Sequence, residues 1–155
     1  MNDGCPGTWN VFHDAIIIAI SGTVPGQLHL TLDCDYLRDR IDHPGNHFYI
    51  TLSGCTRFGY RPWNDDTLVI EDLQLIEQRR LWILSADATQ HFCKVHCNEH
   101  IPYGSGGALE VAAAAMRVTL DDNTSITQSE LELLSEEYWT EWQARADEAR
   151  TRDDK

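Results

Sequence analysis

The residues with the clearest capacity for chemistry lie between positions 91 and 100, in the segment HFCKVHCNEH. On a helix, four of its side chains would share one face at i, i+3, i+4 and i+7, namely Cys93, His96, Cys97 and His100. Thiolate and imidazole are the ligands that zinc prefers, so a helix here would predict a tetrahedral zinc site. The chemistry of the segment therefore depends on whether it forms a helix or a strand.

A strand gives the same residues a different role. At about 3.3 Å per residue, Cys93 and Cys97 would lie roughly 13 Å apart along a strand, whereas a zinc–sulfur bond measures about 2.3 Å. Phe92 and Val95 favour a strand, the glycine-rich IPYGSGG that follows can close a hairpin, and buried cysteine behaves as a small apolar residue. We therefore predict a strand whose cysteines face the core, with no cofactor; a zinc-binding protein is the alternative.

The opening of the chain predicts a β-hairpin over residues 9–34. The segment FHDAIIIAI would place Ile16, Ile18 and Ile20 on one face and Ile17 on the other. SGTVPG supplies the turn, and the leucines of QLHLTLDC alternate with polar residues as they do in a half-buried strand.

Further strands follow after a polar connection that contains a short helical turn. HFYITLSG predicts one strand, and CTRFGYRP continues the sheet until Pro62 ends it. Residues 67–78 and 79–85 are interpreted as two more β segments, with a short helix over residues 71–79 as the alternative. The segment ALEVAAAAMRVTL is interpreted as a strand with a bulge in its alanine run.

The C-terminal segment predicts a long helix. Thr127 and Glu130 have the spacing of a capping box, and Ile126 and Leu131 stand at the staple positions around it. An apolar stripe at helical spacing should bury one face of this helix against the sheet, formed by Leu131, Leu134, Tyr138 and Trp142. The element order predicts an α+β fold with a largely antiparallel sheet, curved or sandwich-like, and a long C-terminal helix packed on it. Residues 1–150 are predicted to form a single domain, and residues 151–155 a polar tail.

Charge restricts the partners of this chain of 155 residues. It carries 12 basic and 25 acidic residues, which give a formal net charge of −13. A field of that sign repels phosphate, so we expect no binding to nucleic acid and none to a membrane. The apolar run AIIIAI is too short to span a bilayer. With five cysteines and no targeting segment at the N-terminus, we predict a cytoplasmic protein with reduced thiols.

Two surfaces are predicted to contact a protein partner. In FGYRPWNDD, interpreted largely as a loop, aromatic residues stand beside carboxylates, and the candidate contacts are Tyr60, Trp63, Asp65 and Asp66. A second acidic patch on the polar side of the C-terminal helix comprises Glu136, Glu137 and Glu141. Trp139 lies off the apolar stripe and is expected to be partly exposed, whereas Trp142 is expected in the core.

The opening hairpin, FHDAIIIAI followed by a turn and LHLTLDC, resembles that of small acidic bacterial proteins of the polymorphic-toxin immunity type. The resemblance covers about the first 35 residues. It implies a compact cytosolic protein that binds and blocks a toxin and has no catalysis of its own. We accordingly predict a non-enzymatic protein-binding domain with no catalytic residues, whose partner is a toxin or another basic protein. The alternatives are the zinc-binding protein and a ligand-binding domain or enzyme with a pocket in the sheet.

Overall fold

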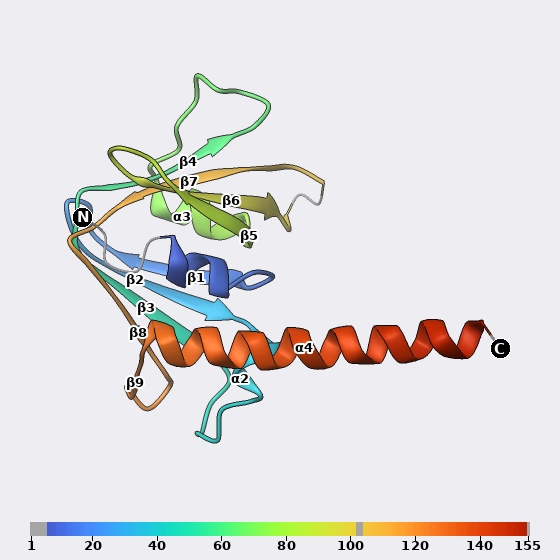
Figure 1. The fold of residues 1–155 in the computed structure, drawn as a ribbon. Coiled ribbons are helices and arrows are strands. Elements are labelled where there is room, and N and C mark those ends of the chain that lie inside the picture. The colour runs from blue at the N-terminus through green and yellow to red at the C-terminus, as the bar shows by residue number, and fades with distance from the viewer. Residues whose placement is uncertain (1–5, 102–103, 155) are drawn as a thin grey trace.

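The computed structural model describes residues 6–101 and 104–154, which form nine antiparallel strands and four helices (Figure 1). The strands are β1 (Ile16–Gly22), β2 (Gly26–Asp33), β3 (Phe48–Cys55), β4 (Arg57–Pro62), β5 (Leu81–Ala88), β6 (Cys93–Glu99), β7 (Gly106–Ala112), β8 (Ala115–Thr119) and β9 (Ser125–Ile126). The helices are α1 (Gly7–Val11), α2 (Asp35–Arg38), α3 (Leu73–Gln78) and α4 (Gln128–Asp153). The strands form one sheet in the order β4-β7-β6-β5-β1-β2-β3-β8-β9. The predicted α+β fold, with a largely antiparallel sheet and a long C-terminal helix, is confirmed.

Two long runs of chain tie the halves of this sheet together. Strands β3 and β4 are separated by Thr56 alone, and β7 and β8 by Ala113 and Ala114. Because β3 pairs with β8 and β4 with β7, both runs pass from one half of the sheet into the other. The halves share one hydrophobic core. The alanine segment is extended, as predicted, but Ala113 and Ala114 divide it into two strands, where one strand with a bulge was predicted.

The sheet is weakest between β1 and β5, where Ile16 and Trp82 form the only register pair between these strands among the described residues. Helix α3 closes the gap beside β1. The Ile20 amide donates to Glu77 Oε2 at 2.7 Å, and Arg80 Nη1 donates to the Ile18 carbonyl at 2.7 Å. These two side chains provide the hydrogen bonds that a neighbouring strand would otherwise supply.

Helix α3 corrects the strand predicted over residues 67–78 and matches the helical alternative. Asp72 is its N-cap, and its side chain accepts hydrogen bonds from the amides of Gln74 and Leu75. A cap of this kind satisfies amides that are free at a helix start, which favours a helix over an extended chain.

The opening hairpin is confirmed from β1 onwards, but its first residues are not extended, since Trp9 and Val11 belong to α1. The predicted isoleucine faces were also wrong. Ile17 and Ile20 are the buried pair, because the β1–β2 register shifts between Ile17 and Ala19. A bulge adds a residue to one strand and so changes which side chains face the core.

Helix α4 begins with the predicted capping box and packs beside α1 and α2 (Figure 1). Leu131 is fully buried, but Trp142 is 46% exposed, which corrects its predicted place in the core. The helix projects past the sheet (Figure 1), so its apolar stripe is not buried along its whole length. Residues 151–153 continue the helix and are not a frayed tail. Within residues 6–101 and 104–154, no helix is both long and apolar enough to cross a bilayer.

Candidate functional site

The segment with the cysteines and histidines is strand β6, as predicted. Cys93 and Cys97 are buried on the core side, whereas His96 points to the opposite face, with its Nε2 3.0 Å from Asp87 Oδ2. His100 is exposed just beyond the strand. The helical geometry on which the zinc alternative depended is therefore not present. In the described part of the chain, no three His, Cys, Asp or Glu side chains are grouped to hold a metal ion.

The buried free cysteines are poor nucleophiles and poor metal ligands. Cys34, Cys55 and Cys97 are free, and burial raises the pKa of Cys34 to about 12 and that of Cys97 further. Burial favours the neutral thiol, whereas the thiolate is the nucleophile and the metal ligand. Cys93 is disulfide-bonded, in contrast to the reduced thiols expected from the sequence.

Tyr60 was predicted to lie in an exposed aromatic loop, and this prediction is wrong. It lies in β4 with its side chain fully buried, because β4 extends to Pro62 and is paired with β7 along its length. Burial raises the pKa of its phenol, whose oxygen has no hydrogen-bond partner within the described chain. The Arg79 guanidinium lies 5.4 Å from the ring centroid and forms an ion pair with the buried Glu99. Tyr60 is therefore a core residue and cannot contact a partner.

The other residues of that segment form the loop surface, defined here as Trp63, Asp65 and Asp66. Trp63 is 55% exposed, and its amide donates to the Gly106 carbonyl at 3.0 Å. Its indole lies over Gly106, where a Cβ atom would overlap the ring. Asp65 Oδ1 accepts hydrogen bonds from the Thr67 hydroxyl and amide at 2.6 and 3.1 Å, which lower the pKa of Asp65. The structure therefore exposes these three predicted contacts without Tyr60.

A second group of aromatic rings lies where α4 meets α2. The aromatic cluster comprises Tyr36, Tyr138, Trp139 and Trp142, with neighbouring ring centroids 4.5 to 5.9 Å apart. His13, just before β1, places its ring 6.0 Å from Trp139. Trp139 is partly exposed, as predicted, and Trp142 is the most exposed member. Ring pairs at these distances contribute more stability than the burial of their surface alone. The exposed indole of Trp142 is therefore held in place by the rings that it contacts.

The three glutamates predicted on α4 differ in their surroundings. Arg40 donates to both carboxylate oxygens of Glu141, which lowers the pKa of Glu141, and its guanidinium lies 5.5 Å from the Tyr138 centroid. Glu136 and Glu137 are exposed and form no ion pair with any described residue. We call Glu136, Glu137, Trp139 and Trp142 the α4 surface.

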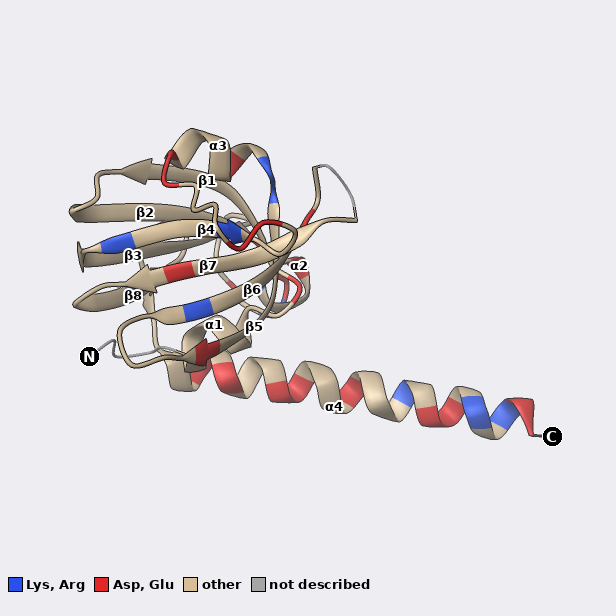
Figure 2. Ribbon diagram, turned by 90° about the horizontal axis from the view of Figure 1, so that it is seen from above, with Lys and Arg blue, Asp and Glu red and all other residues tan. Residues whose placement is uncertain are grey.

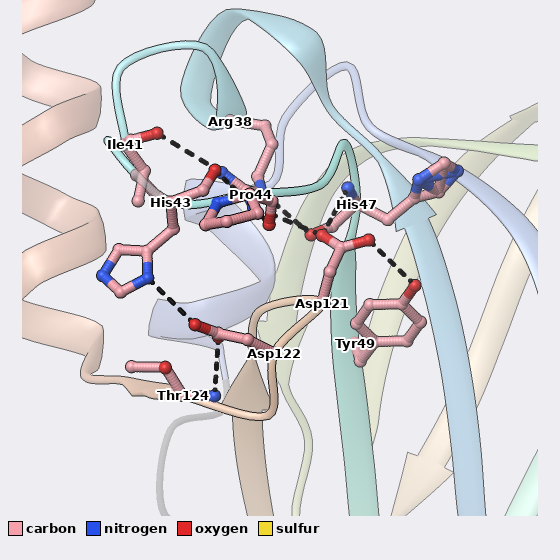
Figure 3. Close-up of polar contacts among 9 residues, drawn as sticks. All are labelled: Arg38, Ile41, His43, Pro44, His47, Tyr49, Asp121, Asp122 and Thr124. Atoms are coloured by element: carbon pink, nitrogen blue, oxygen red, sulfur yellow. Dashed lines mark hydrogen bonds and ion pairs between the residues drawn. The ribbon is translucent and has the colours of Figure 1, made fainter.

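Helix α2, which carries Tyr36, and the following connection, which carries Arg40, are fixed by the buried side chain of Arg38 (Figure 3). The Arg38 guanidinium is 2% exposed and donates to four backbone carbonyls and to Asp121 Oδ1. The carbonyls belong to Ile41, His43, Pro44 and His47, and their distances from the guanidinium nitrogens run from 2.8 to 3.4 Å. One side chain thus organises the whole connection between α2 and β3.

Two aspartates of the β8–β9 turn complete this support. Burial favours the neutral form of Asp121, but hydrogen bonds from the His47 amide, Arg38 and Tyr49 outweigh it and lower its pKa. Hydrogen bonds from Thr124, together with His43, lower the pKa of Asp122 to about 2. Because their oxygens are engaged with neighbouring segments, we interpret both carboxylates as structural groups that position α2.

Two of the depressions on the described surface bear on the choice of a site. One, of about 500 Å³, lies at the outer edge of β4 and is lined by Thr56, Arg57, Gly59, Val69, Glu71, His91 and Ala112. The other, of about 680 Å³, runs along α4 and is lined by Ser135, Glu136, Trp139, Thr140, Gln143, Ala144 and Asp147. The second contains both an aromatic ring and a carboxylate of the α4 surface, and we take it as the candidate site.

Sequence reasoning identified Glu136 of this site but missed Asp147 and the supporting residues Tyr36, Arg40 and His13. Their contacts depend on how α2 and α1 pack against α4, and no spacing along the chain reports that packing. The chain matches no model of a known protein family, no curated protein and no solved structure. The resemblance of the opening hairpin to immunity proteins stays a prediction, and function is inferred from the geometry of the surface.

Proposed function

We propose that this protein is a non-enzymatic, protein-binding domain of the immunity type, which occludes a toxin or another basic partner with its α4 surface. The observation that carries the proposal is the exposed indole of Trp142 on a packed aromatic cluster, on the same helix as Glu136 and Glu137, whose exposed carboxylates have no ion pair within the described chain. Rings held in this way act as anchors in protein interfaces, because little freedom is lost when a partner covers them.

The charge of α4 supports a basic partner. Between residues 128 and 142 the chain has five glutamates and no lysine or arginine. Figure 2 shows acidic residues along this part of α4, with the basic ones confined to its C-terminal part. A patch of one sign speeds the encounter with a partner of the opposite sign and disfavours partners of the same sign.

Gene neighbourhood supplies the test, because an immunity-type protein should bind the product of the gene directly upstream. We expect the two purified proteins to form a complex on size-exclusion chromatography. The double variant Glu136→Arg/Glu137→Arg should remove it. Asp65→Arg/Asp66→Arg carries the same change of charge on the loop surface and should leave the complex intact.

Either of two results would contradict the proposal. One is an upstream product that is an enzyme of metabolism and forms no complex with this protein. The other is a complex that both double variants weaken equally, since that would show attraction by total charge and not by the α4 surface.

A further inference from the structure

We propose that the α4 surface receives an arginine side chain of the partner, stacked on Trp139 and paired with Glu136; this inference rests on the proposed function. It names the chemical group that the acidic surface would recognise. At a neighbouring position on the same helix, the protein already binds one of its own arginines.

Arg40 shows how such a group is held. Its guanidinium lies 5.5 Å from the Tyr138 centroid and donates to the Glu141 carboxylate, Nη1 to Oε1 at 3.3 Å. Tyr138 and Glu141 are three positions apart on α4, so ring and carboxylate are neighbours on the helix surface. One cation is thus bound by an aromatic face and an anion together.

Trp139 and Glu136 form a similar pair on the same helix, also three positions apart but in the opposite order, with the carboxylate N-terminal to the ring and no described cation between them. Both line the α4 depression of about 680 Å³. None of the cation–π contacts within the described chain involves Trp139, and Glu136 has no ion pair there. The site that Arg40 occupies at Tyr138 has an open counterpart at Trp139.

The other groups around this position do not fill it. Asp147, at the far end of the depression, accepts from Gln143 Nε2 at 2.9 Å and lies 3.9 Å from Arg150 Nη1. His13 approaches Trp139 from the body, and its Nδ1 lies 2.6 Å from the Leu84 carbonyl oxygen. Glu136 is therefore the carboxylate of the depression without a described partner, and the part of the Trp139 indole that lines the depression is available to a ligand.

The geometry favours arginine over lysine. A guanidinium is planar, so it can stack on an indole while its N–H groups donate in the plane to a carboxylate. An ammonium is more strongly hydrated and has no flat face, so it gains less from the ring. We expect a preference for arginine and not merely for positive charge.

A blocked tripeptide, acetyl-Ala-Arg-Ala-amide, is the probe for this site, followed by NMR of the tryptophan indole N–H signals. We expect saturable shifts at Trp139 and weaker binding of the lysine peptide. The citrulline peptide, which has nearly the same shape but no charge, should not bind. Glu136→Gln should weaken binding about threefold, which is the size of an exposed cation–π or ion-pair contact. Glu137→Gln, one residue away on another face, should leave it unchanged.

Three results would overturn the inference: equal binding of arginine and citrulline peptides, equal binding of arginine and lysine peptides, or equal effects of Glu136→Gln and Glu137→Gln. Its failure is distinguishable from failure of the proposed function. A complex with the upstream product but no shift at Trp139 would sink the arginine site alone. Shifts at Trp139 without any such complex would sink the proposed function alone.

Discussion

The loop surface and the α4 surface each place an exposed tryptophan beside carboxylates, yet the two are built differently. Trp63 lies over a glycine of β7 and belongs to no ring contact among the described residues, while Asp65 is engaged by Thr67. On α4, Trp142 is the outer member of a four-ring cluster, and Glu136 and Glu137 form no ion pair with residues that the structure describes. Composition alone made the two regions look alike. The two surfaces differ in two respects. Other rings support the exposed indole only on α4, and the α4 glutamates are left without a described partner.

The two surfaces also have separate foundations. In Figure 1, the loop between β4 and α3 lies at the top of the molecule and α4 at the bottom, with the sheet between them. Gly106 positions Trp63, whereas Arg38 positions α2 and through it the aromatic cluster. Each surface can therefore be disturbed without the other, and four measurements follow in order of expected effect.

Arg38→Leu should have the largest effect. It leaves Asp121 and four carbonyls without their buried donor, so the free energy of unfolding should fall by about 3–5 kcal/mol. Urea unfolding measures this loss, and the indole signal of Trp139 should shift while that of Trp63 stays. A loss below about 1 kcal/mol, typical of an exposed pair, would show that Arg38 does not support α2.

Gly106→Ala should act on the loop surface instead. The new Cβ would lie 2.7 Å from the Cys97 carbonyl oxygen and would overlap the Trp63 ring. We expect a loss of about 1–3 kcal/mol in unfolding free energy, as for other overpacked sites, and a shifted Trp63 signal. Ser105→Ala, at an exposed neighbour, is the control and should change neither. An unmoved Trp63 signal in Gly106→Ala would contradict the role given to Gly106.

Asp121→Asn tests the support of α2 through pH. The pKa of Asp121 is lower in the folded protein, so the folded state binds fewer protons than the unfolded state between the two pKa values. The stability from its charge is complete above the unfolded pKa of about 3.9 and is lost as pH falls through the folded value. Native protein should lose more stability than Asp121→Asn between pH about 4 and pH about 2. Parallel urea-midpoint curves for the two proteins would refute this assignment.

Trp142→Ala should have the smallest effect on folding. Since its side chain is 46% exposed, we expect a loss of about 1 kcal/mol or less in unfolding free energy. Leu131→Ala on the same helix is the matched contrast and should cost about 2–5 kcal/mol because that side chain is fully buried. If the two losses were equal, Trp142 would be a packing residue and its value as a partner contact would fall.

The sequence predicted well where one local pattern decides the structure. The alternation of QLHLTLDC fixed Leu28, Leu30 and Leu32 in the core, and Thr127 with Glu130 located the start of α4. Strand β6 was predicted from Phe92, Val95 and the glycine-rich segment that follows, and it is confirmed.

Prediction from the sequence failed where contacts between distant segments determine the burial of a residue. Tyr60 is buried because β4 pairs with β7, which is made about 50 residues later in the chain. Trp142 lies on the predicted helical stripe but is exposed, and α4 extends past the sheet that the stripe was expected to meet (Figure 1). The bulge between Ile17 and Ala19 reversed the isoleucine faces, and nothing in a run of isoleucines marks where a register will shift.

The two long runs that tie the sheet together have a consequence for synthesis on the ribosome. Strands β3 and β4 end by Pro62, but their partners β8 and β7 begin only at Ala115 and Gly106. Until that late segment emerges, the nascent chain carries two unpaired strand edges, which are templates for wrong pairing with other chains. The length of that interval should set how much this protein depends on chaperones while it is being made.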